Sequence, residues 1–316
     1  MLPDTLRNSA IQILEDAGLP QFNEADFTKC NIPIARGGGR SRLVSGTLQT
    51  VDGHSSQVVI KVLRASYAYT KRVKNVDEYI TKLLAYFERE VDIWKRASGH
   101  CNVVRLMGFF PSFEGEMFPA LVLPKYELGS LRSIASAVIQ IFGKQDKLIL
   151  LRDVAQGLAY LHSSNIIHRD IKGANILVTH DERIIACIND FGSAKLMHPI
   201  LDRIANSTQT NSLRWSPPEF VNNVEGYSYS RPTPASDMWS FGCLFLEVFT
   251  GVDPWKGSFE VEEELEQNRH PPIPSDVDIA SEYVEFMLMC WKTQPQERIS
   301  AERAVELIDD FIKRLS

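Results

Sequence analysis

Four polar residues of this chain have the types and spacing that phosphoryl transfer needs. Asp170, Lys172 and Asn175 lie in one short segment, IIHRDIKGANILV at residues 166–178. Such a set can supply a carboxylate that accepts the proton of the attacking hydroxyl, a cation near the transferred group and an amide oxygen for Mg²⁺. Asp190, in the later segment NDFG, adds a carboxylate, and hard cations prefer oxygen ligands. The pattern predicts a phosphoryl-transfer site with Asn175 and Asp190 as metal ligands.

The segment HRDIKGAN, followed by DFG, resembles the catalytic loop and metal-binding loop of the eukaryotic protein kinases. VVIK at 58–61 resembles the strand with the phosphate-anchoring lysine, here Lys61. EREVDIW resembles the helix that carries its carboxylate partner, and we choose Glu90 over the rival Glu88. The resemblance spans roughly residues 30–315 and implies ATP and Mg²⁺ as cofactors. The residues to which it gives catalytic roles are Asp170, Lys172, Lys61 and Glu90.

The same resemblance implies residues that organise the site. SPPE at 216–219 resembles the end of an activation segment, with Pro217 where alanine is usual. In the family this glutamate pairs with a buried arginine, and an aspartate of a buried helix holds the catalytic loop. The histidine of that loop packs on the DFG phenylalanine, the next arginine reads a phosphate, and a hydroxyl contacts the catalytic aspartate and lysine. In this sequence the loop histidine and arginine are His168 and Arg169, and the DFG residues are Phe191 and Gly192. The hydroxyl is that of Ser212, the helix aspartate is Asp237, and the glutamate–arginine pair is Glu219 with Arg298.

Each of these residues also has an ordinary structural interpretation. Lys61 alone could be a solvated lysine on an edge strand. Glu90 alone could be an exposed helix charge, and Asp237 alone could be only a helix N-cap. Taken together, these interpretations do not explain the whole set of motifs, because the motifs occur in the family's order and with its spacing.

The residue at position 172 bears on the substrate class. Serine/threonine kinases of the family usually place lysine two residues after the catalytic aspartate, and Lys172 does so here. We therefore expect transfer to serine and threonine hydroxyls of protein substrates. The sequences of these motifs are most similar to those of the tyrosine kinase-like branch of the family. Dual specificity and a pseudokinase scaffold are the alternatives, while the SPPE element argues against a small-molecule kinase.

The segment ALVLPKYELGSL at 120–131 resembles the strand and hinge that bind adenine. The resemblance implies that Leu123 closes the back of the pocket and that the backbone of Pro124 and Tyr126 faces the base. Leu177 and Ile188 are expected to pack beneath the ring.

The glycine run at 37–39 resembles the family's G-x-G-x-x-G-x-V loop, in which backbone N–H groups approach the phosphates. The glycine run can be aligned with this pattern in two ways, and neither alignment matches every position. The one we prefer aligns Arg36, Gly38, Ser41 and Leu43 with the pattern, and the other aligns Gly37, Gly39, Arg42 and Val44.

Hydroxyl residues gather between Asp190 and Glu219. A phosphate on Ser207, Thr208 or Thr210 could pair with Arg169 and order this segment.

The elements that must position these residues change in character along the chain. Apolar periodicity predicts strands within 43–63, 103–110 and 118–124 and a helix at 77–97. Helix patterns dominate after Gly129. We therefore predict an α+β, two-lobed protein kinase fold, with a small antiparallel sheet plus one helix in the N-lobe, a mostly helical C-lobe and the site in the cleft. The predicted parts are an N-terminal extension at 1–29 with a helix at 8–17, an N-lobe at 30–124, a hinge at 124–129 and a C-lobe at 130–315.

Composition limits the remaining possibilities. The 316 residues carry 34 basic and 40 acidic side chains, a net charge of −6, which argues against general nucleic-acid binding. The five cysteines form no C-x-x-C pair, and no segment is typical of a signal peptide or a membrane span. We expect a monomer without a membrane or nucleic-acid partner, located in the cytoplasm or also in the nucleus. About 30 residues precede the match, so no separate regulatory domain is expected.

Overall fold

The computed structural model describes residues 2–30, 41–49, 53–63, 76–116, 118–196, 210–221 and 231–315. The chain divides into two compact units. The first comprises Met1–Gly99 and Val104–Lys125, and the second comprises His100–Val103 and Tyr126–Ser316. The division after Lys125 falls inside the segment predicted as a hinge.

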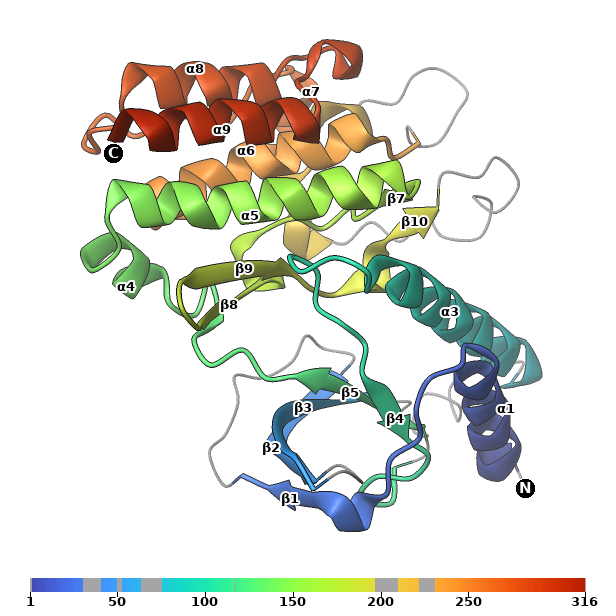
Figure 1. Ribbon diagram of the computed structural model, residues 1–316. Helices are drawn as coiled ribbons and strands as arrows, with labels where there is room; N and C mark the ends of the chain where they lie inside the picture. Colours follow the sequence, from blue (N-terminus) through green and yellow to red (C-terminus); the bar gives the residue numbers. More distant parts are fainter. Residues whose placement is uncertain are drawn as a thin grey trace. The chain divides into compact units, whose positions relative to one another are not determined.

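The first unit is built on an antiparallel five-stranded sheet with the strand order β1-β2-β3-β5-β4 (Figure 1). Its elements are α1 (Leu2–Asp16), β1 (Phe27–Lys29), β2 (Ser41–Gln49), β3 (Ser55–Leu63), α3 (Val76–Ala97), β4 (Gly108–Phe110) and β5 (Ala120–Pro124). Alternate residues of β3, namely Val58, Ile60 and Val62, are fully buried and pack with Phe110 and Phe113. This period of two follows from the pleat of a strand, and it leaves the opposite face of β3 for Lys61.

Three boundaries in this unit differ from the sequence-based expectations. The helix predicted at 8–17 is α1, which starts at Leu2, six residues earlier, because Leu6 extends the buried stripe of the helix. The sheet already begins with β1, inside the segment predicted as an extension. The strand predicted at 103–110 is confined to β4, since the backbone before it bonds to side chains: Val104 O accepts from the Trp94 indole, and Leu106 N–H donates to Ser98.

The second unit is mostly helical and contains two small antiparallel sheets, β6-β8-β9 and β10-β7. Its helices are α4 (Ala135–Gln140), α5 (Lys144–Ser163), α6 (Pro234–Thr250), α7 (Val261–Glu266), α8 (Ser281–Cys290) and α9 (Ala301–Leu315). Its strands are β6 (Gly129–Ser130), β7 (Ile166–Ile167), β8 (Ile176–His180), β9 (Ile184–Ile188) and β10 (Lys195–Leu196). Short 3-10 helices are η2 (Gly173–Asn175), η3 (Phe191–Ser193), η5 (Thr210–Trp215), η6 (Pro218–Phe220) and η7 (Pro295–Glu297).

Helix α6 is the core of the second unit. All its residues from 236 to 249 are buried, and α5 and α8 pack against it, while α9 lies along α5 (Figure 1). Pro234 occupies the first turn, where proline is tolerated, and Gly251 ends the helix in a left-handed conformation with φ of 71°. The antiparallel sheet of the first unit and the helical second unit confirm the predicted fold class.

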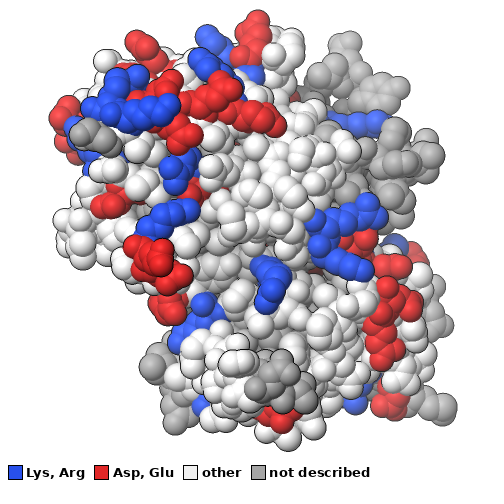
Figure 2. All heavy atoms as spheres, in the orientation of Figure 1, with Lys and Arg blue, Asp and Glu red and all other residues white. Residues whose placement is uncertain are grey.

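Charges of both signs are interspersed on the face shown in Figure 2, including the surface over α8 and α9, where Arg314 pairs with Glu282. No described helix is both long and apolar enough to cross a membrane. All five cysteines lie in described segments and are unpaired thiols. Burial raises the pKa of the Cys187 thiol to about 11.

Candidate active site

In the first unit, the structure brings together the predicted lysine and glutamate. Lys61 on β3 and Glu90 on α3 form an ion pair of 2.8 Å, and both side chains are largely buried. The Lys61 ammonium also lies 5.1 Å from the centre of the Trp94 ring. The rival Glu88 is exposed on α3. Burial and two partners therefore fix the position of the Lys61 ammonium.

The register of β2 and β3 distinguishes the two alignments of the glycine run. Leu43 pairs with Lys61, whereas Val44 pairs with Ile60 and is buried in the core of the sheet. Because side chains alternate along a strand, Leu43 shares the face of Lys61 and Val44 does not. This arrangement favours the alignment with Leu43 at the valine position. Ser41 is the first residue of β2, whereas Arg36, Gly37, Gly38 and Gly39 lie outside the described residues.

The predicted adenine-binding residues belong to both units. In the first unit, Leu123 is buried on β5, and Pro124 ends that strand opposite Val58. In the second unit, the carbonyl of Tyr126 accepts from Gly129 N–H, and Leu177 lies half-buried on β8.

One expectation for adenine packing was wrong. Ile188 is fully buried on β9, close to Gly157 of α5, where a Cβ would lie 2.9 Å from the end of its side chain. Ile188 pairs with Ile176, whereas Leu177 pairs with Cys187, so Ile188 lies on the opposite face of the sheet from Leu177. That face is turned toward α5, and the buried Ile188 offers no surface to a base.

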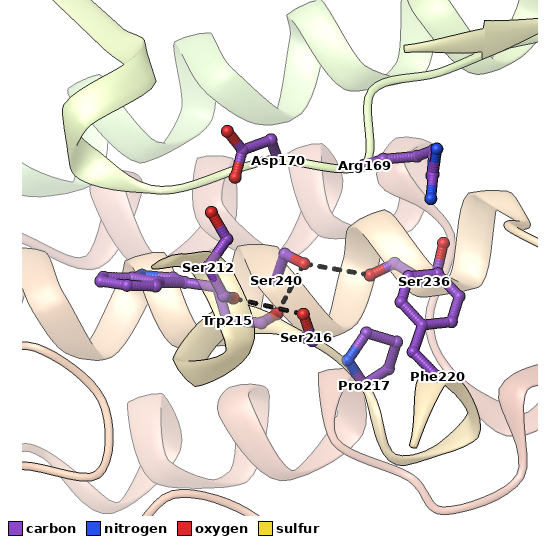
Figure 3. Close-up of a pocket in the computed structure, with 9 residues that line it drawn as sticks. All are labelled: Arg169, Asp170, Ser212, Trp215, Ser216, Pro217, Phe220, Ser236 and Ser240. Atoms are coloured by element: carbon purple, nitrogen blue, oxygen red, sulfur yellow. Dashed lines mark hydrogen bonds between the residues drawn. The ribbon is translucent and has the colours of Figure 1, made fainter. Parts of the chain in front are cut away.

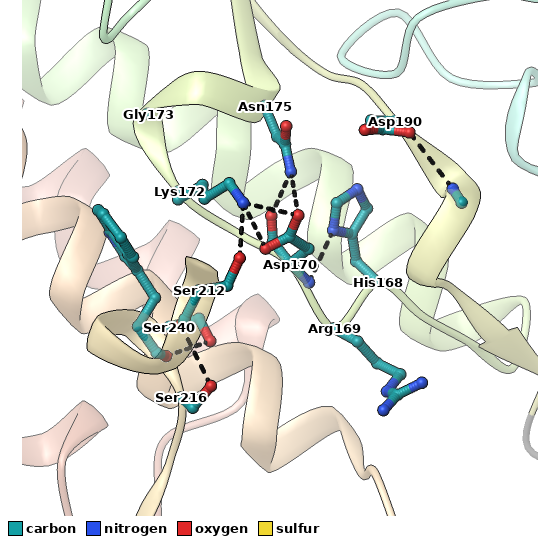
Figure 4. Close-up of polar contacts among 12 residues, drawn as sticks. His168, Arg169, Asp170, Lys172, Gly173, Asn175, Asp190, Ser212, Ser216 and Ser240 are labelled. Carbon is teal, nitrogen blue, oxygen red and sulfur yellow. Dashed lines mark hydrogen bonds and ion pairs between the residues drawn. The ribbon is translucent and has the colours of Figure 1, made fainter. Parts of the chain in front are cut away.

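The second unit holds the catalytic-loop residues in one hydrogen-bonded cluster (Figure 4). The Lys172 ammonium donates to both carboxylate oxygens of Asp170 at 2.8 Å and to Ser212 Oγ at 2.7 Å. The Asn175 amide nitrogen donates to Asp170 Oδ2 and to its carbonyl, both at 2.8 Å. Asp170 is only 7% exposed. Charge-assisted bonds on both oxygens therefore fix the orientation of its carboxylate.

Asp237 of α6 fixes the backbone of the catalytic loop by hydrogen bonds. Its fully buried carboxylate accepts from the backbone N–H groups of His168 and Arg169, at 2.9 and 2.8 Å, and contacts His162 Nε2 at 3.0 Å. Arg169 has a φ of 69°, a conformation that costs a non-glycine residue about 1–2 kcal/mol. Asp237 lies within the first turn of α6 and the N-cap is Thr233, so its carboxylate serves the loop rather than the helix end.

His168 connects the catalytic loop to the DFG segment. Its ring meets Phe191 edge to face at 5.3 Å, and its Nδ1 accepts from Asp170 N–H at 3.3 Å. The other nitrogen, Nε2, lies 3.1 Å from the carbonyl of Asn189 and must donate to it. These contacts fix the tautomer with hydrogen on Nε2.

The predicted metal ligands are held by a backbone contact between their loops. Asn189 N–H donates to the carbonyl of Asn175 at 2.8 Å, which brings the residue before Asp190 against η2. Asp190 has a φ of 68°, and its carboxylate accepts from Gly192 N–H at 3.4 Å. Because the Asn175 amide nitrogen is bound to Asp170, its oxygen points the other way. The amide and carboxylate oxygens fit a hard cation such as Mg²⁺.

One contact of the catalytic loop, made by Glu247, was not predicted from the sequence. Glu247 of α6, only 7% exposed, accepts from Gly173 N–H at 3.0 Å and from the Trp215 indole at 3.1 Å. A Cβ at Gly173 would overlap this carboxylate. Ser240 Oγ holds the other end of Trp215 by donating to its carbonyl at 2.8 Å. The sequence signal that could have identified Glu247 is its position as an acidic residue within the apolar stretch at 238–249.

A small pocket opens between the catalytic loop and the segment that follows Ser212 (Figure 3). Four serines and two aromatic residues of α6 and the activation segment line it together with Asp170. The lining residues are Arg169, Asp170, Ser212, Trp215, Ser216, Pro217, Phe220, Ser236 and Ser240.

The predicted arginine–glutamate pair is present in the second unit. Arg298 donates through both terminal nitrogens to the two carboxylate oxygens of Glu219, at 2.8 and 2.7 Å. Its guanidinium also contacts the carbonyls of Lys292 and Ala235 and lies 5.1 Å from the Trp239 ring. The pair fixes the end of the activation segment against α6.

The predicted phosphate site of the activation segment lies only partly within the described residues. Arg169 Nη1 donates to the carbonyl of Ser193 at 3.4 Å. Thr210 begins η5, and Ser207 and Thr208 lie outside the described residues.

Comparison with known proteins agrees with this geometry. The family model described as protein kinase domain matches residues 50–307. Cell division control protein 7 of Schizosaccharomyces pombe is 33% identical over 245 residues, 75% of this chain and 20% of that protein. Mitogen-activated protein kinase kinase kinase A of Dictyostelium discoideum is 31% identical over 241 residues, 73% of this chain and 23% of that protein.

A third relative is mitogen-activated protein kinase kinase kinase 3 of Arabidopsis thaliana, 31% identical over 227 residues, 69% of this chain and 32% of that protein. The chain thus spans between a fifth and a third of the length of these relatives. The matched segment includes Lys61, Glu90, the catalytic loop, Asp190 and Arg298. The chain belongs to the eukaryotic protein kinase superfamily.

Proposed function

We propose that this chain is a protein serine/threonine kinase that transfers the γ-phosphoryl group of ATP to hydroxyls of protein substrates. The observation that carries the proposal is the cluster in which Lys172 bridges Asp170 and Ser212. A carboxylate held with a cation beside it suits an acceptor hydroxyl that loses its proton while negative charge develops on the transferred group. The names of the relatives support the same class.

The residues of the cluster have separate parts in this proposal. Asp170 orients the acceptor hydroxyl and accepts its proton, and Lys172 neutralises charge near the phosphoryl group. Asn175 and Asp190 hold Mg²⁺, which when bound offsets negative charge on the phosphates. Asn175 can fill both roles because its nitrogen holds Asp170 and its oxygen is turned away from that contact.

In the first unit, Lys61 anchors phosphates of ATP and Glu90 keeps its ammonium in place. An isolated lysine has four rotatable bonds, so an ion pair that fixes it lowers the entropy lost when phosphate binds. Leu43, on the same face of the sheet as Lys61, contacts the nucleotide.

A pseudokinase scaffold is the second candidate. It would keep the fold without transferring phosphate, and in known phosphoryl-transfer sites each polar part is needed. All five parts, Lys61, Glu90, Asp170, Asn175 and Asp190, are present here, which favours the enzyme. The resemblance to the tyrosine kinase-like branch, and a dual specificity, stay predictions.

The acceptor class can be tested with three peptide libraries of identical flanking composition, in which serine, threonine or tyrosine is the sole acceptor. With Mg²⁺ and labelled ATP, we expect incorporation into the serine and threonine libraries and none into the tyrosine library above the no-enzyme background. Equal labelling of all three would replace the proposal with a dual-specificity kinase. Nucleotide binding without labelling of any library would favour the scaffold.

A further inference from the structure

Helix α1 has no part in the function proposed above, and the matched kinase segment starts only at residue 50. In the structure α1 lies beside α3, the helix that carries Glu90 (Figure 1). Among the described elements, α3 packs against α1 more extensively than against any other. Among the described helices and strands, the main packing partner of the helix that carries Glu90 is therefore a segment outside the matched domain.

The face that α1 buries is an apolar stripe. Leu6, Ala10 and Leu14 recur every four residues along α1 and are 4%, 0% and 0% exposed. Side chains at this spacing lie on one face of a helix. Neighbouring positions such as Asn8 and Glu15 are exposed, so α1 has one buried face and one solvated face.

The segment that follows α1 is fastened to the edge of the sheet. Phe109 of β4 donates to the carbonyl of Pro20 at 3.0 Å, and Phe22 N–H donates to the carbonyl of Phe109 at 2.8 Å. Gly108 is needed at this edge, since a Cβ there would overlap the Pro20 carbonyl. A third tie runs from Arg7 of α1 to the carbonyl of Glu116 at 3.0 Å. These three hydrogen bonds tie α1 and the segment after it to the first unit's sheet and its flanking loop.

Helix α3 is joined to the sheet and to the segments that flank it by three side-chain contacts that bear on Glu90. Glu90 pairs with Lys61, Phe87 meets Phe118 edge to face at 5.4 Å, and the Trp94 indole donates to Val104 O at 2.7 Å. Any tilt of α3 away from the sheet would lengthen the 2.8 Å pair. A helix that is fixed to the sheet and packed against α3 opposes that tilt.

We propose that α1 is a positioning brace: through α3 it holds Glu90 on Lys61, and the rate of phosphoryl transfer depends on it. The inference rests on the proposed kinase function and adds an intramolecular regulator to it. Leu6, Ala10 and Leu14 act as positioning residues, because they influence the phosphates of ATP only through α3 and Glu90.

The test compares two substitutions that introduce the same side chain on neighbouring positions of α1. Leu14→Gln places an amide in the buried stripe, and Glu15→Gln places it on the solvated face. Because a misplacement of about 1 Å can cost about 10²-fold in rate, we expect Leu14→Gln to lower kcat by about tenfold or more. KM for the peptide should change less than about twofold, since the peptide contacts other residues. Glu15→Gln should match the wild type, and the conservative Leu14→Met should restore most of the activity.

A double substitution separates positioning from general loss of stability. If α1 acts through Glu90, Leu14→Gln should cause no further loss of kcat in a Glu90→Gln background, because the pair is already broken. A loss of the same factor in both backgrounds would overturn the inference. So would an unchanged kcat in Leu14→Gln in the wild-type background.

Hydrogen–deuterium exchange gives a measurement that does not depend on activity. In Leu14→Gln, and in the milder Leu14→Ala, we expect faster exchange of the α3 amides and unchanged exchange in α5 and α6. Unchanged protection of α3 would overturn the brace even if the kinase is active. Loosened α3 in a chain without phosphoryl transfer would support the brace while contradicting the proposed function.

Discussion

The indole N–H of Trp215 lies 3.1 Å from the buried carboxylate of Glu247. The same carboxylate accepts the backbone N–H of Gly173 at 3.0 Å. One side chain of α6 thus joins the catalytic loop to the segment that ends at Glu219. The position of Ser212 relative to Asp170 depends on this contact, since Ser212 and Trp215 belong to the same 3-10 helix.

The first prediction concerns the pH dependence of stability. Burial raises the pKa of Glu247 above its ordinary value of 4.5, and the bonds from Gly173 and Trp215 offset only part of that effect. The folded state thus holds the proton more tightly than the unfolded state does. The stability that Glu247 contributes is full below pH 4.5 and is lost as pH rises through the raised pKa. The melting temperature of the wild type minus that of Glu247→Gln should therefore be larger at pH 5 than at pH 8.

The control for this measurement is Glu306→Gln, which changes an exposed glutamate of α9. Its melting temperature at the two pH values gives the baseline against which the difference for Glu247→Gln is compared. A difference for Glu247→Gln that grows from pH 5 to pH 8 would contradict the assignment of a raised pKa.

The second prediction concerns Ser212. Its hydroxyl accepts from Lys172 at 2.7 Å, and hydrogen bonds to charged groups contribute about 1.5–3 kcal/mol. If the bond positions Lys172 for transfer, Ser212→Ala should lower kcat by about tenfold or more. Ser212→Thr keeps the hydroxyl and should retain most activity. Ser216→Ala removes a hydroxyl whose one hydrogen bond within the described part of the chain is to the Ser212 carbonyl, at 3.2 Å, and serves as the matched control in the same steady-state assay.

The third prediction concerns the Arg298–Glu219 pair. The Arg298 side chain is 0% exposed, and removing one partner of a buried pair costs about 3–5 kcal/mol because the other charge is left unpaired. Arg298→Ala should therefore lower the melting temperature by on the order of 10 °C. Arg303→Ala breaks an exposed pair with Glu306, and such pairs contribute about 0–1 kcal/mol. Equal shifts for the two variants, measured by differential scanning calorimetry, would show that burial does not set the cost.

The fourth prediction tests the alignment of the glycine run. Leu43 shares the face of Lys61, so Leu43→Ala should weaken ATP binding about fivefold through loss of about 1 kcal/mol of apolar contact. Val44 lies in the core, and Val44→Ala should cost about 2 kcal/mol of stability with little change in affinity for ATP. Titration calorimetry and thermal denaturation separate the two effects. Weaker ATP binding by Val44→Ala alone would favour the alignment that uses Gly37, Gly39 and Arg42.

The sequence predicted those features that depend on local patterns. The spacing of Asp170, Lys172 and Asn175 within one loop identified a cluster that the structure indeed holds together. Long helices and the β2–β3 hairpin were also predicted, since their apolar periods extend over many residues. Two-residue strands such as β6 and β7 have no detectable period, so periodicity could not find them.

Other features depend on tertiary contacts. Glu247 was missed because its partners, Gly173 and Trp215, lie 74 and 32 residues away in the sequence. The early start of α1 depends on Leu6, whose burial is set by packing within the first unit. Ile188 was placed beneath a base because it follows the family pattern. Its position opposite Ile176, on the face of β9 near Gly157, could be learned only from the strand register.

The most direct test of the account is phosphoryl transfer by Asp170→Asn, compared with the wild type and with Asp181→Asn. Asp170 is the carboxylate bound by Lys172 and Asn175, whereas Asp181 lies exposed in the turn between β8 and β9. The account predicts that Asp170→Asn loses at least about 10²-fold in kcat, as expected when a proton acceptor is removed, while Asp181→Asn matches the wild type. Equal incorporation of phosphate by the wild type and Asp170→Asn would contradict it.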